Sequence, residues 1–359
     1  MLTSITIKNF RTFKDVTVPL KPLTVFIGAN NSGKTNAIRA IELIAAAAGK
    51  SWWADQSGPS QRGAPATIEV AGEFRNTKFK ALLKGATPIE PLGTAALEFS
   101  GEVNWKPAFA QGNQQGTQAP GGHQFASPNA AAFVMNSLIA IQGALPEAFE
   151  FFRGVRIASL SVPKLREPSP VSKDPILGER GENFGAVLDW ASGKPSLFRS
   201  INAELQRVLK VDGCTTLVTD HGMKIAAINE GDQSFGADVI SDGVLLYMGL
   251  TTVAHLVGPN SLLIIEEPEN GIHPRRLKDL LEQIRSIQKR GTQVILTTHS
   301  PILLDEFSDE PESIVVFDRD PSGATHVSQP APEQLKAVLN GDFGLGSLWF
   351  SGAIGGVPA

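Results

Sequence analysis

The sequence of 359 residues is 42% hydrophobic, so the chain is long enough to bury a large core in one elaborate domain or two lobes. A formal net charge of -4 argues against a basic field over the whole surface, and any nucleic-acid site must therefore be a local patch. The single cysteine, Cys214, excludes an intramolecular disulfide, and no apolar run reaches the length of a membrane-spanning helix. These features predict a soluble, cytoplasmic protein.

The first residues alternate between apolar and polar side chains, which predicts a β-strand rather than a secretion signal. Residues 15–20 predict a second strand that is closed by a proline turn. This hairpin stands directly before a glycine-rich loop, so Arg11 is expected near that loop. Two roles are open for Arg11: contact with a phosphate or base, or a solvated position in the turn.

The strongest motif follows the hairpin and matches G-x-x-x-x-G-K-[ST], the phosphate-binding loop, between a predicted buried strand and a predicted helix. Glycines let backbone N–H groups curl around a polyphosphate, and the helix N-terminus adds its positive dipole. Lys34 supplies a mobile cation for the β- and γ-phosphates, and the Thr35 hydroxyl is a ligand for Mg²⁺. The motif predicts an ATP site formed by Asn30, Asn31, Ser32, Gly33, Lys34, Thr35 and Asn36.

The middle of the chain carries fewer chemical signals. Alternating runs between residues 66 and 105 predict an antiparallel side sheet, and the polar stretch 110–128 is expected to be mobile. Helical patterns follow. The sequence contains no sustained heptad pattern, which excludes a long coiled coil. Arg166 is interpreted either as a contact to nucleotide or partner or as a surface arginine. Cys214 is interpreted as a buried structural thiol rather than a nucleophile.

Two later apolar strands end in residues that suit phosphoryl transfer. One strand ends in Glu266 and Glu267, and the other is followed by His299. In a parallel sheet, these strand ends lie beside the phosphate loop. One carboxylate is expected to hold Mg²⁺, and the next to orient or deprotonate the attacking water. The histidine is expected to hydrogen-bond the γ-phosphate or that water.

The motifs resemble one family when they are taken together. The phosphate loop, Ser241-Asp242-Gly243, Ile264-Ile265-Glu266-Glu267-Pro268 and Thr298-His299-Ser300 occur in the order seen in ABC-type ATPase heads. Residues 5–13 resemble the RecF/SMC-like branch. Residues 240–245 and 266–274 are similar to the overcoming-lysogenization-defect (OLD) ATPases and their stand-alone relatives that lack the Toprim domain. The resemblance spans nearly the whole chain.

The resemblance implies an α/β fold of the P-loop NTPase class. We expect an ABC-type head with a mixed sheet, an antiparallel side sheet, a helical lobe that carries the signature motif, and no long coiled coil. Residues 1–109 would form the N-terminal part of the head, and residues 110–128 a flexible loop. Residues 129–248 would form the helical lobe, and residues 249–359 the C-terminal part of the head.

The resemblance also implies roles for single residues. Ser241 and Gly243 would form the signature motif, which caps the γ-phosphate bound to the opposite subunit, so that a homodimer encloses two ATP molecules. Glu266 would be the Walker B acid, Glu267 the catalytic base and His299 the switch histidine.

The chain departs from the family pattern at three points. Glu266 replaces the more usual aspartate, and Asp242 replaces the second glycine of the transporter signature. No glutamine of the Q-loop is identified, which leaves one expected Mg²⁺ ligand unassigned. Asn270 would lie in the D-loop.

These features predict an ATPase that binds ATP and Mg²⁺, dimerises around two ATP molecules and regulates a separately encoded, nuclease-like effector in phage defence or DNA maintenance. Only about sixty residues follow Ser300, too few for a Toprim domain, so the chain is not expected to be a nuclease itself. The alternatives are a RecF-like ATPase that binds DNA and, less favoured, a transporter subunit. The tail after Gly341 either packs on its own domain or docks a partner.

Overall fold

The computed structural model describes residues 1–47, 66–74, 77–84, 96–101, 146–173, 175–331, 333–335 and 343–357. The chain divides into two compact units, and it passes between them several times. Unit 1 contains Met1–Lys21, Asn30–Val155 and Phe317–Ser328, and unit 2 contains Pro22–Ala29, Arg156–Val316 and Gln329–Ala359. The loop expected at 110–128 lies outside the described residues.

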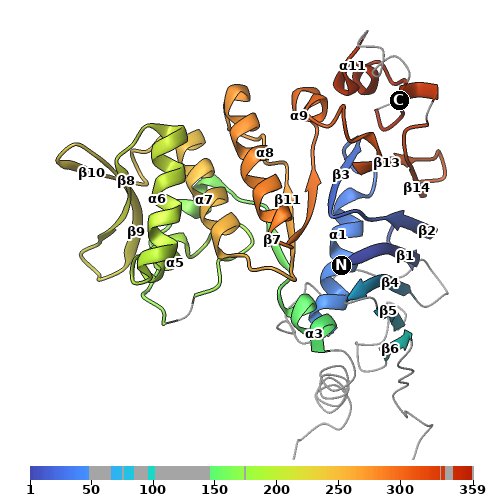
Figure 1. Ribbon diagram of the computed structural model, residues 1–359, viewed down its shortest axis with the longest axis horizontal. Coiled ribbons are helices and arrows are strands. Elements are labelled where there is room, and N and C mark those ends of the chain that lie inside the picture. Colours follow the sequence, from blue (N-terminus) through green and yellow to red (C-terminus); the bar gives the residue numbers. More distant parts are fainter. Residues whose placement is uncertain are drawn as a thin grey trace, which may run out of the picture. The chain divides into compact units, whose positions relative to one another are not determined.

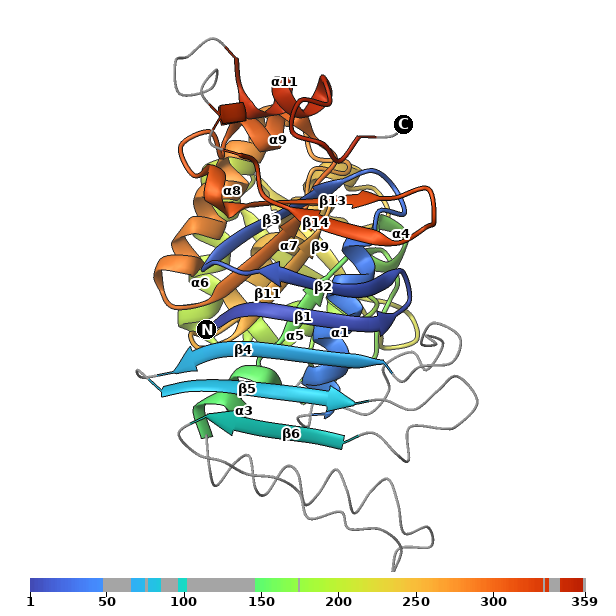
Figure 2. The ribbon, with the colours of Figure 1, turned by 90° about the vertical axis from the view of Figure 1, so that its right-hand side faces the viewer.

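Unit 1 is built on an antiparallel sheet with the strand order β2-β1-β4-β5-β6 (Figures 1 and 2). Ile5 of β1 pairs with Val18 on one side and Val70 on the other, so apolar residues line up on one face. This sheet confirms the predicted antiparallel side sheet. Its strands are β1 (Leu2–Phe10), β2 (Phe13–Pro19), β4 (Thr67–Phe74), β5 (Thr77–Lys84) and β6 (Ala96–Gly101).

Two helices of unit 1, α1 (Lys34–Ala47) and α3 (Pro146–Arg153), supply its remaining core. Aromatic rings join α3 to the sheet, because Phe151 meets Phe74 edge to face with a centroid distance of 5.2 Å. Such a pair adds to the stabilisation from apolar burial. The short strand β14 (Thr325–Ser328) also belongs to this unit.

Unit 2 is built on parallel strands in the order β3-β12-β11-β7. Their residues are buried almost without interruption, as expected for a parallel sheet that is covered on both faces. The first half of β13 (Ile314–Arg319) lies beside β3. The parallel strands are β3 (Leu23–Gly28), β7 (Arg156–Ala158), β11 (Leu262–Glu266) and β12 (Gln293–Thr297).

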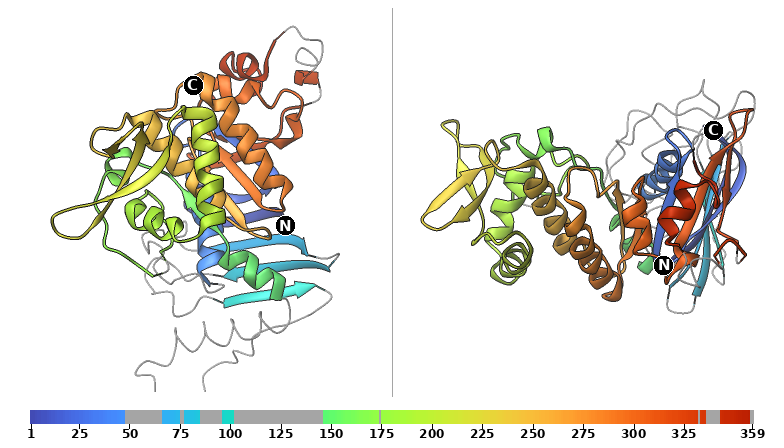
Figure 3. Two further views of the ribbon diagram at one scale, coloured as in Figure 1. Left: turned by 60° about the vertical axis from the view of Figure 1, so that its left-hand side comes forward. Right: turned by 90° about the horizontal axis from the view of Figure 1, so that it is seen from above.

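A lobe of helices and a small sheet follows β7 within unit 2 (Figure 3). Its helices are α4 (Val162–Leu165), α5 (Phe184–Ser192), α6 (Pro195–Leu209) and α7 (Asp242–Leu256). Its antiparallel sheet has the order β10-β9-β8, formed by β8 (Gly213–Val218), β9 (Lys224–Glu230) and β10 (Gln233–Gly236). Strands β8 and β9 pair antiparallel from Gly213 and Asn229 to Val218 and Lys224, and so form a hairpin.

Cys214 of β8 is buried, as the sequence predicts for a structural thiol. Burial raises the pKa of its thiol to about 12. The thiolate is therefore scarce at neutral pH, which argues against a nucleophilic role. Across the described residues, no helix combines the length and apolar character needed to cross a membrane.

The C-terminal tail packs on its own unit. Leu345, Trp349 and Ile354 join the buried core of unit 2, and the indole Nε1 of Trp349 donates to the carbonyl of Gly356 at 3.3 Å. Helix α11 (Leu345–Phe350) lies against α9 (Pro301–Asp305). A side chain at position 346 would come within 2.1 Å of the Pro301 carbonyl, so only glycine permits this contact.

Replacing Trp349 by alanine should lower the free energy of unfolding by about 3–5 kcal/mol, because the substitution opens a cavity in the core. Phe350, its neighbour on α11, is 81% exposed whereas Trp349 is 6% exposed, so Phe350→Ala is a matched control. That control should change the free energy of unfolding by about 0.5 kcal/mol or less. Urea unfolding measures both variants. Equal effects of the two substitutions would contradict the packing of the tail.

Candidate functional site

The parallel strands of unit 2 bring several predicted site residues to one edge of the sheet. Phe26 of β3 pairs with Thr297 of β12, and Thr297 pairs with Glu266 of β11. The backbone N–H of Glu267 donates to the Thr297 carbonyl at 3.0 Å, which extends the row beyond the strand end. The glycine loop leaves β3 at Gly28, so it begins at this same edge.

Glu267 lies at the centre of a small polar cluster. Its Oε2 accepts a hydrogen bond from Asn270 Nδ2 at 2.6 Å, and its Oε1 lies 3.5 Å from His299 Nε2. Its φ of +46° falls in the left-handed region, which is strained for a residue with a side chain. The structure thus brings together the predicted base, the predicted switch histidine and the asparagine assigned to the D-loop.

A cavity of about 160 Å³ borders this acidic edge. Glu266, Glu267 and Asn270 line it from the strand end, and Leu246 and Leu250 line it from α7. The remaining lining residues are Ser159, Leu160 and Pro268. A cavity with several polar groups and this volume has room for water molecules, which hydrolysis requires.

The loop before α7 is held by Arg166. Its guanidinium donates to the carbonyls of Ala237, Asp238 and Ile240, and it pairs with the Asp242 carboxylate at 2.6 Å. The side chain is only partly exposed. The sequence suggests either a contact to nucleotide or partner or a surface position for Arg166. Instead, Arg166 fixes the backbone that leads into the predicted signature motif.

The predicted signature residues lie at the first turn of α7. Ser241 is the N-cap residue of this helix and is exposed to solvent, as is Asp242. Gly243 lies so close to the predicted D-loop that an added Cβ would come within 2.6 Å of the Gly271 carbonyl. The start of α7 therefore packs directly against the segment that follows Glu267.

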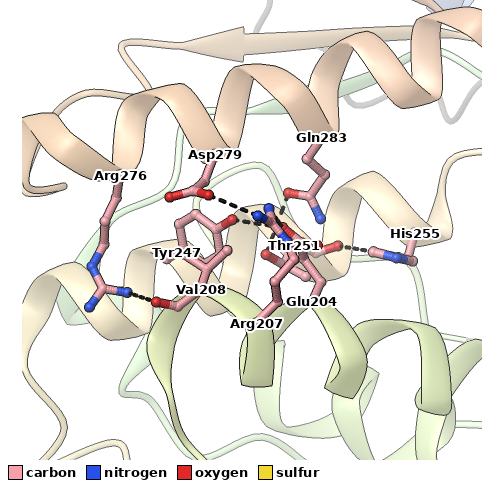
Figure 4. Close-up of polar contacts among 9 residues, drawn as sticks. All are labelled: Glu204, Arg207, Val208, Tyr247, Thr251, His255, Arg276, Asp279 and Gln283. Atoms are coloured by element: carbon pink, nitrogen blue, oxygen red, sulfur yellow. Dashed lines mark hydrogen bonds and ion pairs between the residues drawn. The ribbon is translucent and has the colours of Figure 1, made fainter.

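Helix α7 is also anchored along its length (Figure 4). The Tyr247 hydroxyl donates to Glu204 Oε1 of α6 at 3.0 Å, and Arg207 of α6 bridges Glu204 to Asp279 of α8 (Pro274–Lys289). Burial raises the pKa of Tyr247, so its hydroxyl stays protonated as a donor. The network fixes the spacing of three helices. Of these, α7 begins at the predicted signature motif, and α8 begins just after the predicted D-loop.

The part of the phosphate loop in unit 1 is held by residues far away in the sequence. Arg11 Nη1 donates to Asn36 Oδ1 at 3.1 Å, which places Arg11 beside the first turn of α1, as the hairpin predicts. The Thr325 hydroxyl of β14 donates to the Ser32 carbonyl at 2.8 Å. Gly33 has a φ of +118°, and a Cβ there would meet the Thr325 hydroxyl at 2.5 Å.

Three supporting residues have roles that the sequence motifs do not predict: Arg166, which anchors a loop, Thr325, and Glu269, which accepts hydrogen bonds from Thr298 and His299. Their partners are distant along the chain, so no local pattern reveals the contacts. The sequence offers a weak signal only for Glu269, because it stands inside a run of three glutamates around Pro268.

The residue types fit a nucleotide with Mg²⁺. The Ser32 hydroxyl oxygen is buried in the phosphate loop without a hydrogen-bond partner, as expected for a group whose partner is a bound ligand. Lys34, also buried, offers a cation. Within the described residues, no three His, Cys, Asp or Glu side chains gather to hold a metal by themselves. A Mg²⁺ ion would thus need phosphate oxygens beside Thr35 and Glu266.

Comparisons with known proteins agree with this geometry. A family model described as an AAA ATPase domain matches residues 1–84. A second model, described as an AAA domain, putative AbiEii toxin, type IV TA system, matches residues 146–305. The OLD nuclease of Thermus scotoductus is 23% identical over 347 residues, which cover 89% of this chain and 63% of that relative.

Two solved structures show a similar fold. The SMC head bound to the C-winged helix domain of ScpA has a TM-score of 0.56 and 13% identity, and the match covers 93% of this chain and 99% of that chain. The SMC head domain from Thermotoga maritima has a TM-score of 0.52 and 13% identity, with coverage of 92% and 99%. These likenesses confirm the predicted ABC-type head.

The matches confirm the resemblance to OLD-like ATPases of the RecF/SMC-like branch. The chain is thus similar in sequence to AAA ATPase domains over residues 1–84 and to an AAA domain over residues 146–305, is similar to an OLD nuclease, and has a fold like that of SMC heads. It spans 63% of the length of that relative.

Replacing Arg166 by methionine should loosen the loop at residues 237–242, because three carbonyls lose a charged donor. We expect the free energy of unfolding to fall by about 1–3 kcal/mol and the amides of this loop to exchange faster with deuterium. Arg180→Met, at an exposed arginine, is the matched control and should leave both quantities unchanged. Unaltered exchange at Val239 and Ile240 in the Arg166 variant would argue against the anchor.

Proposed function

We propose that the chain binds ATP with Mg²⁺ and hydrolyses it to ADP and phosphate. The cluster of Glu267, His299 and Asn270 carries this proposal, because it places a carboxylate and an imidazole side by side at the sheet edge where the phosphate loop begins. The buried, unpartnered Ser32 hydroxyl in the loop supports a phosphate ligand there.

Each residue has a defined task in this proposal. The backbone of Asn30, Asn31, Ser32 and Gly33 cradles the phosphates, while Lys34 neutralises their charge. Bound Mg²⁺ would neutralise the charge that develops on the phosphate oxygens, with Thr35 and Glu266 as its protein ligands. Arg11 and Asn36, which hydrogen-bond each other, would contact the nucleotide.

Glu267 would accept a proton from the attacking water, and its contacts suit that task. The hydrogen bond from Asn270 fixes one carboxylate oxygen, and the other faces His299. The histidine would bond the water or the γ-phosphate. A base whose oxygens are held in this way needs little reorganisation when the reaction begins.

We further propose that two copies enclose two ATP molecules. Ser241 is exposed at the N-terminus of the 15-residue helix α7, and its side chain makes no capping hydrogen bond. The hydroxyl and the helix dipole are therefore available to an anion. With Gly243 beside it, Ser241 would cap the γ-phosphate bound to the other copy.

The ATP-bound dimer would regulate a nuclease-like effector that a separate chain supplies, in phage defence or DNA maintenance. The support is the similarity to an OLD nuclease, together with one matching model that is described as an AAA domain, putative AbiEii toxin, type IV TA system. Regulation through a clamp that grips DNA is less favoured. Two basic residues at the ends of α8, Arg276 and Arg290, are engaged within the chain, because they donate to the carbonyls of Val208 and Ala254.

Replacing Glu267 by glutamine should lower the turnover number by about a hundredfold or more, because the amide cannot accept the proton of water. The affinity for ATP should persist, and the variant with ATP should sediment as a dimer, since hydrolysis no longer opens it. The measurements are steady-state phosphate release, binding of a fluorescent ATP analogue and analytical ultracentrifugation.

Two controls make this test specific. Lys34→Ala should lose nucleotide affinity itself, so it separates binding from chemistry. Glu282→Gln makes the same chemical change on the exposed face of α8 and should leave turnover unchanged. Normal turnover in the Glu267 variant would remove Glu267 from its role, and retained affinity in the Lys34 variant would discredit the phosphate loop.

A further inference from the structure

We propose that Glu269 is a positioning residue, which holds the backbone of His299 so that the imidazole faces Glu267. The inference rests on the proposed hydrolysis of ATP, and it adds a residue to which no sequence motif gives a role. Glu269 belongs to the turn after β11, and His299 follows β12, so the carboxylate connects two segments that are thirty residues apart.

One oxygen of Glu269 carries both links. Oε1 accepts the Thr298 hydroxyl at 2.7 Å and the backbone N–H of His299 at 2.8 Å. The Thr298 hydroxyl oxygen in turn accepts the backbone N–H of Ser300 at 2.9 Å. The start of the segment after β12 is therefore fixed by a short chain of hydrogen bonds that ends on Glu269.

These links set the distance between the two catalytic candidates. Glu267 and Glu269 lie in one tight turn, in which the backbone N–H of Asn270 donates to the Glu267 carbonyl at 3.0 Å. The His299 ring lies 3.5 Å from Glu267, and its backbone is tied to Glu269. Removing the tie to Glu269 would loosen the backbone that carries the imidazole, and a displacement of about 1 Å is enough to slow a reaction about a hundredfold.

The carboxylate of Glu269 is largely removed from solvent, which is costly for a charged group. Its second oxygen, Oε2, is buried without a hydrogen-bond partner, and such a group weakens a fold unless the rest of the side chain compensates. Burial raises the pKa of the Glu269 carboxyl, while the hydrogen bonds from Thr298 and His299 oppose the shift. An ordinary surface glutamate would keep both carboxylate oxygens in water. The buried position of Glu269 therefore supports a specific role for its hydrogen bonds.

The first test measures the contact itself and needs no nucleotide. Hydrogen exchange of the His299 amide is followed by NMR in the wild type, Glu269→Ala and Glu269→Gln. Glutamine keeps an oxygen acceptor in place, so its His299 amide should stay protected, whereas alanine should speed the exchange by about tenfold or more. Glu282→Ala, which removes an exposed glutamate from α8, should behave as the wild type.

The second test measures the consequence for the reaction. Glu269→Ala should lower kcat by about tenfold to a hundredfold with KM and nucleotide affinity almost unchanged, and glutamine should restore most of the rate. Glu269→Asp keeps the charge but withdraws it by one methylene, so it should resemble alanine. If alanine at this position prevents folding, the comparison of Asp with Gln still decides the question.

Several results would overturn the inference. These are wild-type kcat in Glu269→Ala or Glu269→Asp, equal losses in the Gln and Ala variants, or unchanged exchange at His299 when the acceptor is removed. A wild-type chain that hydrolyses no ATP would instead refute the proposed function, and the exchange measurement would still report whether Glu269 holds His299.

Discussion

The alignment of three parallel strands is the constraint on which the candidate site depends. Backbone pairing sets Phe26, Thr297 and Glu266 in one row, so the chain leaves β3, β12 and β11 at a common edge of the sheet. A shift of one residue in any of these pairings would turn a predicted catalytic side chain to the opposite face. The near-complete burial of the strands is what a parallel sheet covered on both faces requires.

The loops at this edge are held by polar side chains from remote parts of their own unit. Arg166 ties down the loop before α7, Thr325 braces the phosphate loop, and Glu269 connects the turn after β11 to the segment after β12. Loops carry exposed backbone groups and have few apolar contacts, so directed hydrogen bonds give them a defined shape. A site prepared in this way loses less entropy when a ligand binds.

Much of this could be predicted from the sequence, because the informative features are local. The glycine loop, the paired carboxylates Glu266 and Glu267, and the strand before His299 are contiguous patterns with a direct physical meaning. Strand alternation likewise predicts the antiparallel sheet of unit 1. The anchoring contacts could not be predicted: Arg166 reaches residues more than seventy positions away, and only the folded chain brings such partners together.

The tail illustrates the same limit. Its glycines and aromatic residues are compatible with packing on its own domain or with docking a partner. The close approach of Gly346 to Pro301 and the buried indole of Trp349 depend on where α9 lies. The composition of a segment indicates that it is apolar, but it does not indicate which surface the segment packs against.

The most direct measurement is a crystal structure with Mg²⁺ and a non-hydrolysable ATP analogue. The account predicts a triphosphate wrapped by residues 28–35, with its γ-phosphate near Glu267 and His299 of one copy and Ser241 of the other. A nucleotide bound elsewhere, or Ser241 remote from every nucleotide in both copies, would contradict it.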